Sequence, residues 1–202
     1  MDSDPVIIAN VLEKNSKMKK ILKQYPGIRL PSGWNPFEIA IATILGQLVS
    51  IERGRTLVSD LIEIAGTPVH DLKIDRKITL FPTPKQIMNA DLSSLKTTQM
   101  RKKTLIAFAT AVDNGDICLE ATQHVDLFFK KVLAIKGIGP WSAQYMALKI
   151  LRDTDSFPGS DLILARALEL HSKEVIDSMA PWRGYVASLL WRTYAATLTK
   201  KK

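Results

Sequence analysis

Residues 133–143 read LAIKGIGPWSA, and this stretch decides the fold that we expect. Its two glycines, Gly137 and Gly139, flank one aliphatic residue, Ile138, between segments whose apolar residues recur with helical spacing. Glycine permits a tight backbone turn, and the aliphatic side chain can enter the core that two helices share. Proline favours the first turn of a helix, so the second helix should begin at about Pro140. The stretch predicts a helical hairpin whose backbone N–H groups face outward, where a phosphate can accept from them.

Helical signals recur through the rest of the chain, whereas strand signals do not. An Asn-Pro-x-Glu helix start at 35–38 is followed by apolar residues as far as Leu48. No Asn-Gly or Asp-Gly turn lies between alternating segments, so the looser stretches 66–82 and 113–123 are interpreted as loops. The sequence therefore predicts an all-α fold in one compact unit. Further helical periods, starts and stops occupy 83–86, 105–115, 125–135, 142–151, 162–170 and 181–198.

The composition indicates a globular, basic protein of a reducing compartment. The 202 residues include 28 Lys and Arg against 20 Asp and Glu, a formal net charge of +8. This excess favours a polyanionic partner, although solvated lysines alone would also produce it. Cys118 is the only cysteine, which excludes an internal disulfide, a zinc finger and a four-cysteine iron–sulfur cluster. An acidic start and the lack of an apolar run of about 18 residues predict an intracellular chain without a membrane span.

The glycine turn is specific only when the longer string around it is considered. A Gly-x-Gly turn alone joins many helix pairs, and a dinucleotide-binding fingerprint is excluded because Ser142 stands at the third glycine position and no strand precedes. The whole string Leu-x-x-Lys-Gly-Ile-Gly-Pro-Trp-Ser-Ala resembles the helix-hairpin-helix of the DNA glycosylase superfamily, in which Gly and Pro are followed by a later Asp. The segments 36–50, 81–84 and 181–191 look like the 3-methyladenine DNA glycosylase II branch of that superfamily.

The resemblance implies a two-lobed helical catalytic core formed by residues 1–202 as a single unit. A central lobe is expected over 51–165, with the hairpin at 133–143, and a terminal lobe over 1–50 together with 166–202. Some bacterial relatives carry an extra N-terminal β-rich domain. We do not expect that domain here, because the roughly thirty residues before the similar region are too few to encode it.

The resemblance also implies the residues of an active site. Asp161 follows Trp141 by 20 positions, as the catalytic aspartate does in the family. Taken alone, Asp161 would be an acidic residue in the first turn of a helix capped nearby, and only the hairpin upstream favours the catalytic role. Trp141, Tyr145 and Trp191 are expected to line the base pocket, although Tyr145 is equally compatible with the core.

The DNA contacts implied by the resemblance lie on the hairpin and on one further loop. Gln47 and Leu48 match the wedge that fills the gap left by a flipped nucleotide, although Leu48 could equally be a buried helix residue. A monovalent cation would be held by hairpin carbonyls and would bridge to a phosphate. The hairpin contacts are Lys136, Gly137, Ile138 and Gly139, and the cation ligands are the carbonyls of Leu133, Ile135 and Ile138.

The residue at position 141 decides the expected reaction. Bifunctional glycosylase/lyases of the superfamily have a lysine there that forms a Schiff base with the sugar, which tryptophan cannot do. The resemblance thus implies a monofunctional glycosylase that flips an alkylated purine and hydrolyses its N-glycosidic bond with Asp161. Two alternatives stay open: a lyase for oxidised bases that uses Lys136 or Lys149, and a hairpin module that only holds DNA.

The expected partner is double-stranded DNA that contains a damaged base. No cofactor is required apart from the cation at the hairpin, and no iron–sulfur cluster is expected. The protein should act as a monomer, in the cytoplasm or nucleoid of a prokaryote or in the nucleus of a eukaryote.

Overall fold

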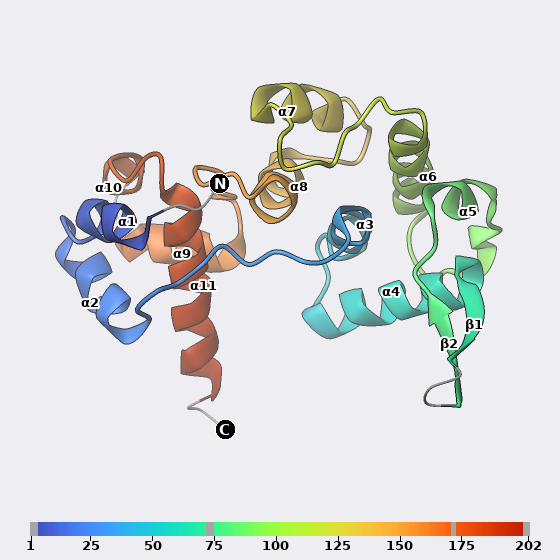
Figure 1. Ribbon diagram of the computed structural model, residues 1–202, viewed down its shortest axis with the longest axis horizontal. Helices are drawn as coiled ribbons and strands as arrows, with labels where there is room; N and C mark the ends of the chain where they lie inside the picture. Colours follow the sequence, from blue (N-terminus) through green and yellow to red (C-terminus); the bar gives the residue numbers. More distant parts are fainter. Residues whose placement is uncertain (1–3, 72–74, 171–172, 200–202) are drawn as a thin grey trace.

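The computed structural model describes residues 4–71, 75–170 and 173–199, and helices form most of it (Figure 1). The first half contains α1 (Pro5–Leu12), α2 (Ser16–Gln24), α3 (Pro36–Leu45), α4 (Ile51–Ala65), β1 (Thr67–Asp71), β2 (Arg76–Leu80), α5 (Pro84–Asn89) and the 3₁₀ turn η1 (Leu92–Ser94). The second half contains α6 (Gln99–Asp113), α7 (Val125–Leu133), α8 (Pro140–Met146), the π-helical turn η2 (Ala147–Leu151), α9 (Leu162–Leu170), α10 (Lys173–Asp177) and α11 (Arg183–Thr199). The predicted all-α fold class is confirmed, and α1, α2, α4 and α10 are helices that the sequence analysis did not identify.

Helix starts are the best-predicted local features. The Asn35 side chain accepts hydrogen bonds from the backbone N–H groups of Phe37, at 2.9 Å, and Glu38, at 3.2 Å. Thr83 and Gln86 form a reciprocal capping box at the start of α5. These bonds satisfy N–H groups that have no partner within the helix, which is why the short polar residues mark the starts so reliably.

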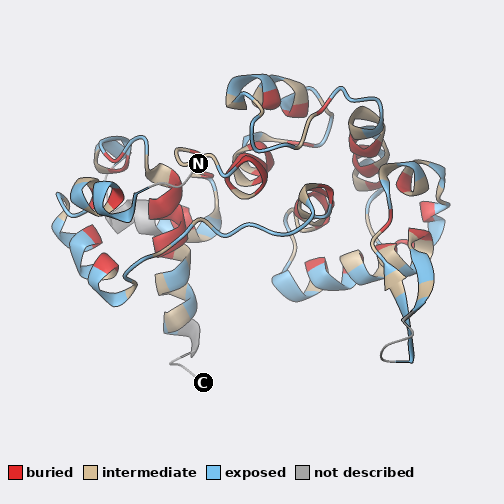
Figure 2. Ribbon diagram, in the orientation of Figure 1, coloured by how far each residue is buried: buried red, intermediate tan, exposed pale blue. Residues whose placement is uncertain are grey.

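The buried residues form two hydrophobic clusters (Figure 2). The first cluster is built by α3 to α8 and η2, and the second by α1, α2, α9, α10 and α11. The chain between α2 and α3 runs from one group of helices to the other (Figure 1). The expected lobe boundary at residue 50 differs from this division, because the buried face of α3 packs against α4, α6 and α8 in the first cluster.

A two-stranded antiparallel sheet lies where the sequence analysis expected only a loop. Strand β1 pairs with β2 in a register that sets Thr67 opposite Leu80 and Asp71 opposite Arg76. The hairpin was missed because most of β2 is exposed, so that no alternation of apolar and polar residues marks a buried face. Gly66, which ends α4 directly before β1, lies very close to β2, since a Cβ atom there would overlap the carbonyl oxygen of Leu80.

No helix within the described ranges is long and apolar enough to span a membrane. In the same ranges, no group of three or more His, Cys, Asp or Glu side chains is arranged to hold a metal ion.

Candidate active site

Asp161 lies at the start of α9, where its carboxylate is fixed by four N–H donors. Oδ1 accepts from the backbone N–H groups of Ile163, at 3.0 Å, and Leu164, at 3.2 Å. The indole N–H of Trp191 donates to the same oxygen at 3.0 Å, whereas the indole of Trp141 reaches Oδ2 at 3.4 Å. Asp161 is therefore itself the cap of α9, and not a first-turn residue behind another cap. The bonds keep one oxygen saturated and leave Oδ2 with a single long contact.

Three aromatic side chains surround this carboxylate. The rings of Trp141 and Tyr145 are stacked, with centroids 5.2 Å apart and planes inclined by 20°. Tyr145 meets Trp191 edge to face, with centroids 5.7 Å apart. The rings come from two clusters of the fold, because α8 lies in the first and α11 in the second. The structure thus brings together all four residues expected for the catalytic group and base pocket, and it leaves Tyr145 partly exposed rather than in the core.

Two further groups at this site have perturbed acidities. Burial, and secondarily the negative charge of Asp161, raises the pKa of the Tyr145 hydroxyl, so the phenol stays protonated near neutral pH. Burial lowers the pKa of the Lys149 ammonium, because desolvation disfavours its charged form. The Lys149 Nζ lies 5.5 Å from the centroid of the Tyr145 ring and 6.0 Å from that of Trp191. A lysine side chain therefore belongs to this site.

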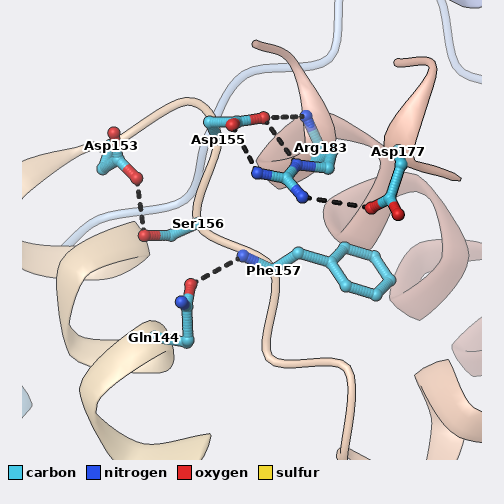
Figure 3. Close-up of polar contacts among 7 residues, drawn as sticks. All are labelled: Gln144, Asp153, Asp155, Ser156, Phe157, Asp177 and Arg183. Atoms are coloured by element: carbon cyan, nitrogen blue, oxygen red, sulfur yellow. Dashed lines mark hydrogen bonds and ion pairs between the residues drawn. The ribbon is translucent and has the colours of Figure 1, made fainter. Parts of the chain in front are cut away.

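A network of polar contacts fixes the loop that carries Asp161 (Figure 3). Arg183, at the start of α11, donates to Asp155 through Nε at 2.8 Å and Nη2 at 2.6 Å, and to Asp177 through Nη1 at 3.2 Å. These hydrogen bonds raise the pKa of Arg183. On the other side of the loop, Gln144 Oε1 accepts from the backbone N–H of Phe157 at 2.9 Å. The loop is tied both to α8, which bears Trp141, and to α11, which bears Trp191, so the network sets the position of the carboxylate between the two rings.

The hairpin of residues 136–139 joins α7 to α8 as the sequence predicts. Ile138 is buried in the first cluster. Gly137 has φ +96°, and a Cβ atom there would lie 2.2 Å from Thr104 Oγ1, whereas nothing lies within 4 Å of a Cβ at Gly139. The Thr104 hydroxyl also donates to the Lys136 carbonyl at 2.9 Å. The two glycines thus differ, since only Gly137 is required by both conformation and space.

The predicted wedge loop follows α3, which ends at Leu45 and not at Leu48. Leu48 has φ +55° and a relative exposure of 103%, so the alternative of a buried helix residue is wrong. Gln47 Nε2 donates to the Gly137 carbonyl at 3.1 Å and to Ser142 Oγ at 2.7 Å. Arg101 Nη2 donates to the carbonyl of Gln47 at 2.5 Å. These bonds join the loop to the hairpin and hold an apolar side chain in solvent.

A basic groove of about 540 Å³ lies beside the wedge loop, and none of the residues around Asp161 lines it. Its lining includes Val49, next to Leu48, and residues of α4 and α6 and of the segment that precedes α6. The cationic side chains in the lining are Arg53, Lys96, Arg101 and Lys102. None of them was predicted, nor was Thr104; the contacts of Arg53, Arg101 and Thr104 join segments 32 to 54 residues apart in the chain.

The known proteins that are similar to this chain in sequence or in structure are DNA repair enzymes. No protein-family model matches the chain. Over 205 aligned residues it is 30% identical to the probable bifunctional transcriptional activator/DNA repair enzyme AlkA of Mycobacterium tuberculosis, covering 96% of this chain and 40% of that protein. It is 28% identical to DNA-3-methyladenine glycosylase 2 of Escherichia coli, covering 89% of this chain and 65% of that protein. The chain spans less than two thirds of the length of either relative.

Two solved structures share the fold. A Clostridium acetobutylicum 8-oxoguanine glycosylase/lyase in complex with double-stranded DNA matches with a TM-score of 0.78 at 20% identity, covering 96% of this chain and 71% of that one. A fission-yeast 3-methyladenine DNA glycosylase in complex with abasic DNA matches with a TM-score of 0.69 at 20% identity, covering 92% of this chain and 95% of that one.

The hairpin and the aspartate that follows it agree with these comparisons: the chain has the fold of DNA glycosylases of the helix-hairpin-helix type. In sequence it is similar to proteins named as 3-methyladenine DNA glycosylases.

Proposed function

We propose that this chain is the catalytic core of a monofunctional DNA glycosylase, which acts as a monomer, flips an alkylated purine out of duplex DNA and hydrolyses its N-glycosidic bond. The observation that carries the proposal is the Asp161 carboxylate, held by backbone and indole N–H groups beside three aromatic rings. A module that only clamps the DNA backbone needs neither this carboxylate nor the rings, so the geometry favours catalysis over simple binding.

The chemistry follows from the unequal use of the two carboxylate oxygens. As the bond to the base breaks, the sugar gains positive charge, which a fixed carboxylate stabilises without having to reorganise. Oδ1 is occupied by three N–H donors, so Oδ2 is the oxygen available to face the sugar and to guide the attacking water. An alkylated purine already carries positive charge and leaves without an acid, and therefore one carboxylate can suffice.

Three surface features support duplex DNA as the partner. The Cβ position of Gly139 in the hairpin is open, the Leu48 side chain is exposed on the loop that Gln47 joins to the hairpin, and the basic groove is lined by Val49, which follows Leu48. Leu48 would fill the space of the flipped nucleotide, while the cations of the groove would meet backbone phosphates. The hydrogen bonds of Gln47 to Gly137 and Ser142 would keep wedge and hairpin in register on the duplex.

A monovalent cation fits the hairpin carbonyls that the sequence analysis named. In the described part of the chain, the carbonyl of Ile135 accepts from the Ile138 N–H at 3.0 Å, and no backbone N–H outside the helices donates to the carbonyl oxygen of Leu133 or Ile138. Two free carbonyl oxygens and one with a spare lone pair suit a hard cation. Bound there, the ion would supply positive charge toward a phosphate.

The test of the proposed function is base release from duplexes that carry one 7-methylguanine, 3-methyladenine, hypoxanthine or 8-oxoguanine. The expected products from the methylated purines are free base and intact abasic strands, which break only after alkali. Borohydride should trap no covalent protein–DNA adduct, because Trp141 has no amine. A trapped adduct would instead support the lyase alternative through Lys149, and retention of every base would reject the glycosylase itself.

Replacing Trp141 by alanine should reduce excision of methylated purines more than it reduces binding of duplex DNA. The ring is stacked on Tyr145, and losing it removes a surface for a flipped cationic base that is worth about 1–3 kcal/mol. Single-turnover excision and anisotropy binding measure the two effects separately. The control is Trp34→Ala, at a tryptophan that is fully exposed outside the pocket. Unchanged excision by Trp141→Ala would show that the ring does not contact the base.

A further inference from the structure

Lys149 is a cation beside the aromatic side chains that surround Asp161. It lies on η2, one turn after Tyr145, with Nζ 5.5 Å from the Tyr145 ring centroid and 6.0 Å from that of Trp191. Its backbone is fixed as well, since the Ser32 hydroxyl donates to its carbonyl at 2.9 Å. No carboxylate in the described ranges forms an ion pair with its ammonium. The rings that would stack on a flipped base therefore already face one positive charge.

The ammonium and the catalytic carboxylate share these rings. The indole N–H of Trp191 donates to Asp161 Oδ1 at 3.0 Å, and the Lys149 ammonium approaches the same indole. Burial lowers the pKa of the ammonium, which makes it a stronger proton donor than a lysine in solvent. An acid and a carboxylate thus both contact the Trp191 indole, so the site offers a proton donor in addition to the Asp161 carboxylate.

A base that is cationic and a base that is neutral should respond to this ammonium in opposite ways. A cationic N-alkylated purine leaves as a neutral molecule, gains nothing from an acid and is repelled by a like charge in its pocket. A neutral purine leaves with the electron pair of the broken bond, so its leaving group develops negative charge. A nearby ammonium stabilises that charge in the transition state, where it contributes to the rate.

We propose that Lys149 is a catalytic acid that extends the enzyme to neutral damaged purines, and that it disfavours cationic ones. The C1′–N9 bond breaks with its electron pair remaining on the purine, and the Lys149 ammonium gives a proton to a nitrogen of the leaving base. Water adds to C1′ and loses a proton to the Asp161 carboxylate, which releases it to solvent, and solvent returns a proton to the lysine amine. The net reaction is hydrolysis. This assignment rests on the proposed glycosylase function and names its substrate class.

The experiment compares Lys149→Met with the wild-type chain in single-turnover excision from two duplexes, one with hypoxanthine and one with 7-methylguanine. General-acid catalysis contributes about 10²-fold or more, so hypoxanthine excision should fall by about that factor, while 7-methylguanine excision should rise. Lys149→Arg keeps the charge but has no transferable proton near neutral pH. It should leave hypoxanthine excision low and 7-methylguanine excision near the wild-type rate.

The control for the loss of one positive charge on DNA binding is Lys85→Met, on the exposed surface of α5. An equal fall of both excision rates in Lys149→Met, recovery of hypoxanthine excision in Lys149→Arg, or a wild type that excises only 7-methylguanine would overturn the assignment of Lys149. A wild type that excises neither base would instead reject the proposed function, so the two failures are distinguishable.

Discussion

Asp161→Asn is expected to lower base excision by about 10²-fold or more while the variant still binds duplex DNA. The change removes the negative charge that, in the proposed reaction, would stabilise the sugar cation, and it leaves the shape of the side chain almost unchanged. The amide oxygen can still accept from the N–H groups of Ile163 and Leu164, so the cap of α9 persists. Single-turnover excision from an alkylated duplex measures the loss, and thermal unfolding verifies that the fold is kept.

The control for Asp161→Asn is Asp113→Asn, which removes one carboxylate at the exposed end of α6, outside the site. It should retain wild-type excision. Near wild-type turnover by Asp161→Asn would show that the carboxylate is only a helix cap. A variant that fails to bind undamaged duplex would show that the change acts through the fold and not through the reaction.

Gly137→Ala is expected to destabilise the protein more than Gly139→Ala, the same substitution at the other glycine of the hairpin. The backbone there has φ +96°, and the new Cβ atom would lie 2.2 Å from Thr104 Oγ1. The strain of an alanine in a left-handed backbone conformation and the overpacking against Thr104 together should lower the free energy of unfolding by about 2–4 kcal/mol. Displacing the hairpin should also weaken binding to damaged and undamaged duplex alike, because the proposed function places its contacts on the DNA backbone. Denaturant unfolding and anisotropy at fixed salt measure both effects.

Gly115→Ala is the matched control, since Gly115 also has a left-handed backbone, with φ +76°, but nothing within 4 Å of its Cβ position. Gly115→Ala should lower the free energy of unfolding only by the cost of placing alanine in a left-handed backbone conformation, about 1–2 kcal/mol, and it should keep DNA binding. Gly139→Ala, where the Cβ position is likewise open, should leave stability nearly unchanged. Equal costs for Gly137→Ala and Gly115→Ala would mean that Thr104 moves aside freely.

The wedge loop shows a limit of predicting structure from the local spacing of apolar residues. Apolar spacing predicted a helix as far as Leu48, and the side chain could then have been buried or a wedge. The structure ends α3 at Leu45 and exposes Leu48 because three distant groups hold the loop: Gly137, Ser142 and Arg101. Hydrogen bonds between segments 54 to 95 residues apart leave no trace in the local period of a sequence.

The sequence by itself determined the helical class, the hairpin and the position of Asp161 behind it. Each of these is encoded over a few neighbouring residues: a capping side chain, a proline in the first turn, or a glycine where the backbone turns left-handed. The resemblance to the glycosylase family, carried by the same residues, also named Trp141, Tyr145 and Trp191.

Only the tertiary structure decided which groups surround the carboxylate. It sets the indole of Trp191 against Asp161, the Thr104 hydroxyl over Gly137 and the Lys149 ammonium beside two rings. It also shows a β-hairpin at 67–80 that has no clear alternating pattern. The physical reason is that such contacts form only when several helices bury their apolar faces together. This burial brings together residues that are far apart in the sequence, and the local sequence around each residue does not show which distant residue it will contact.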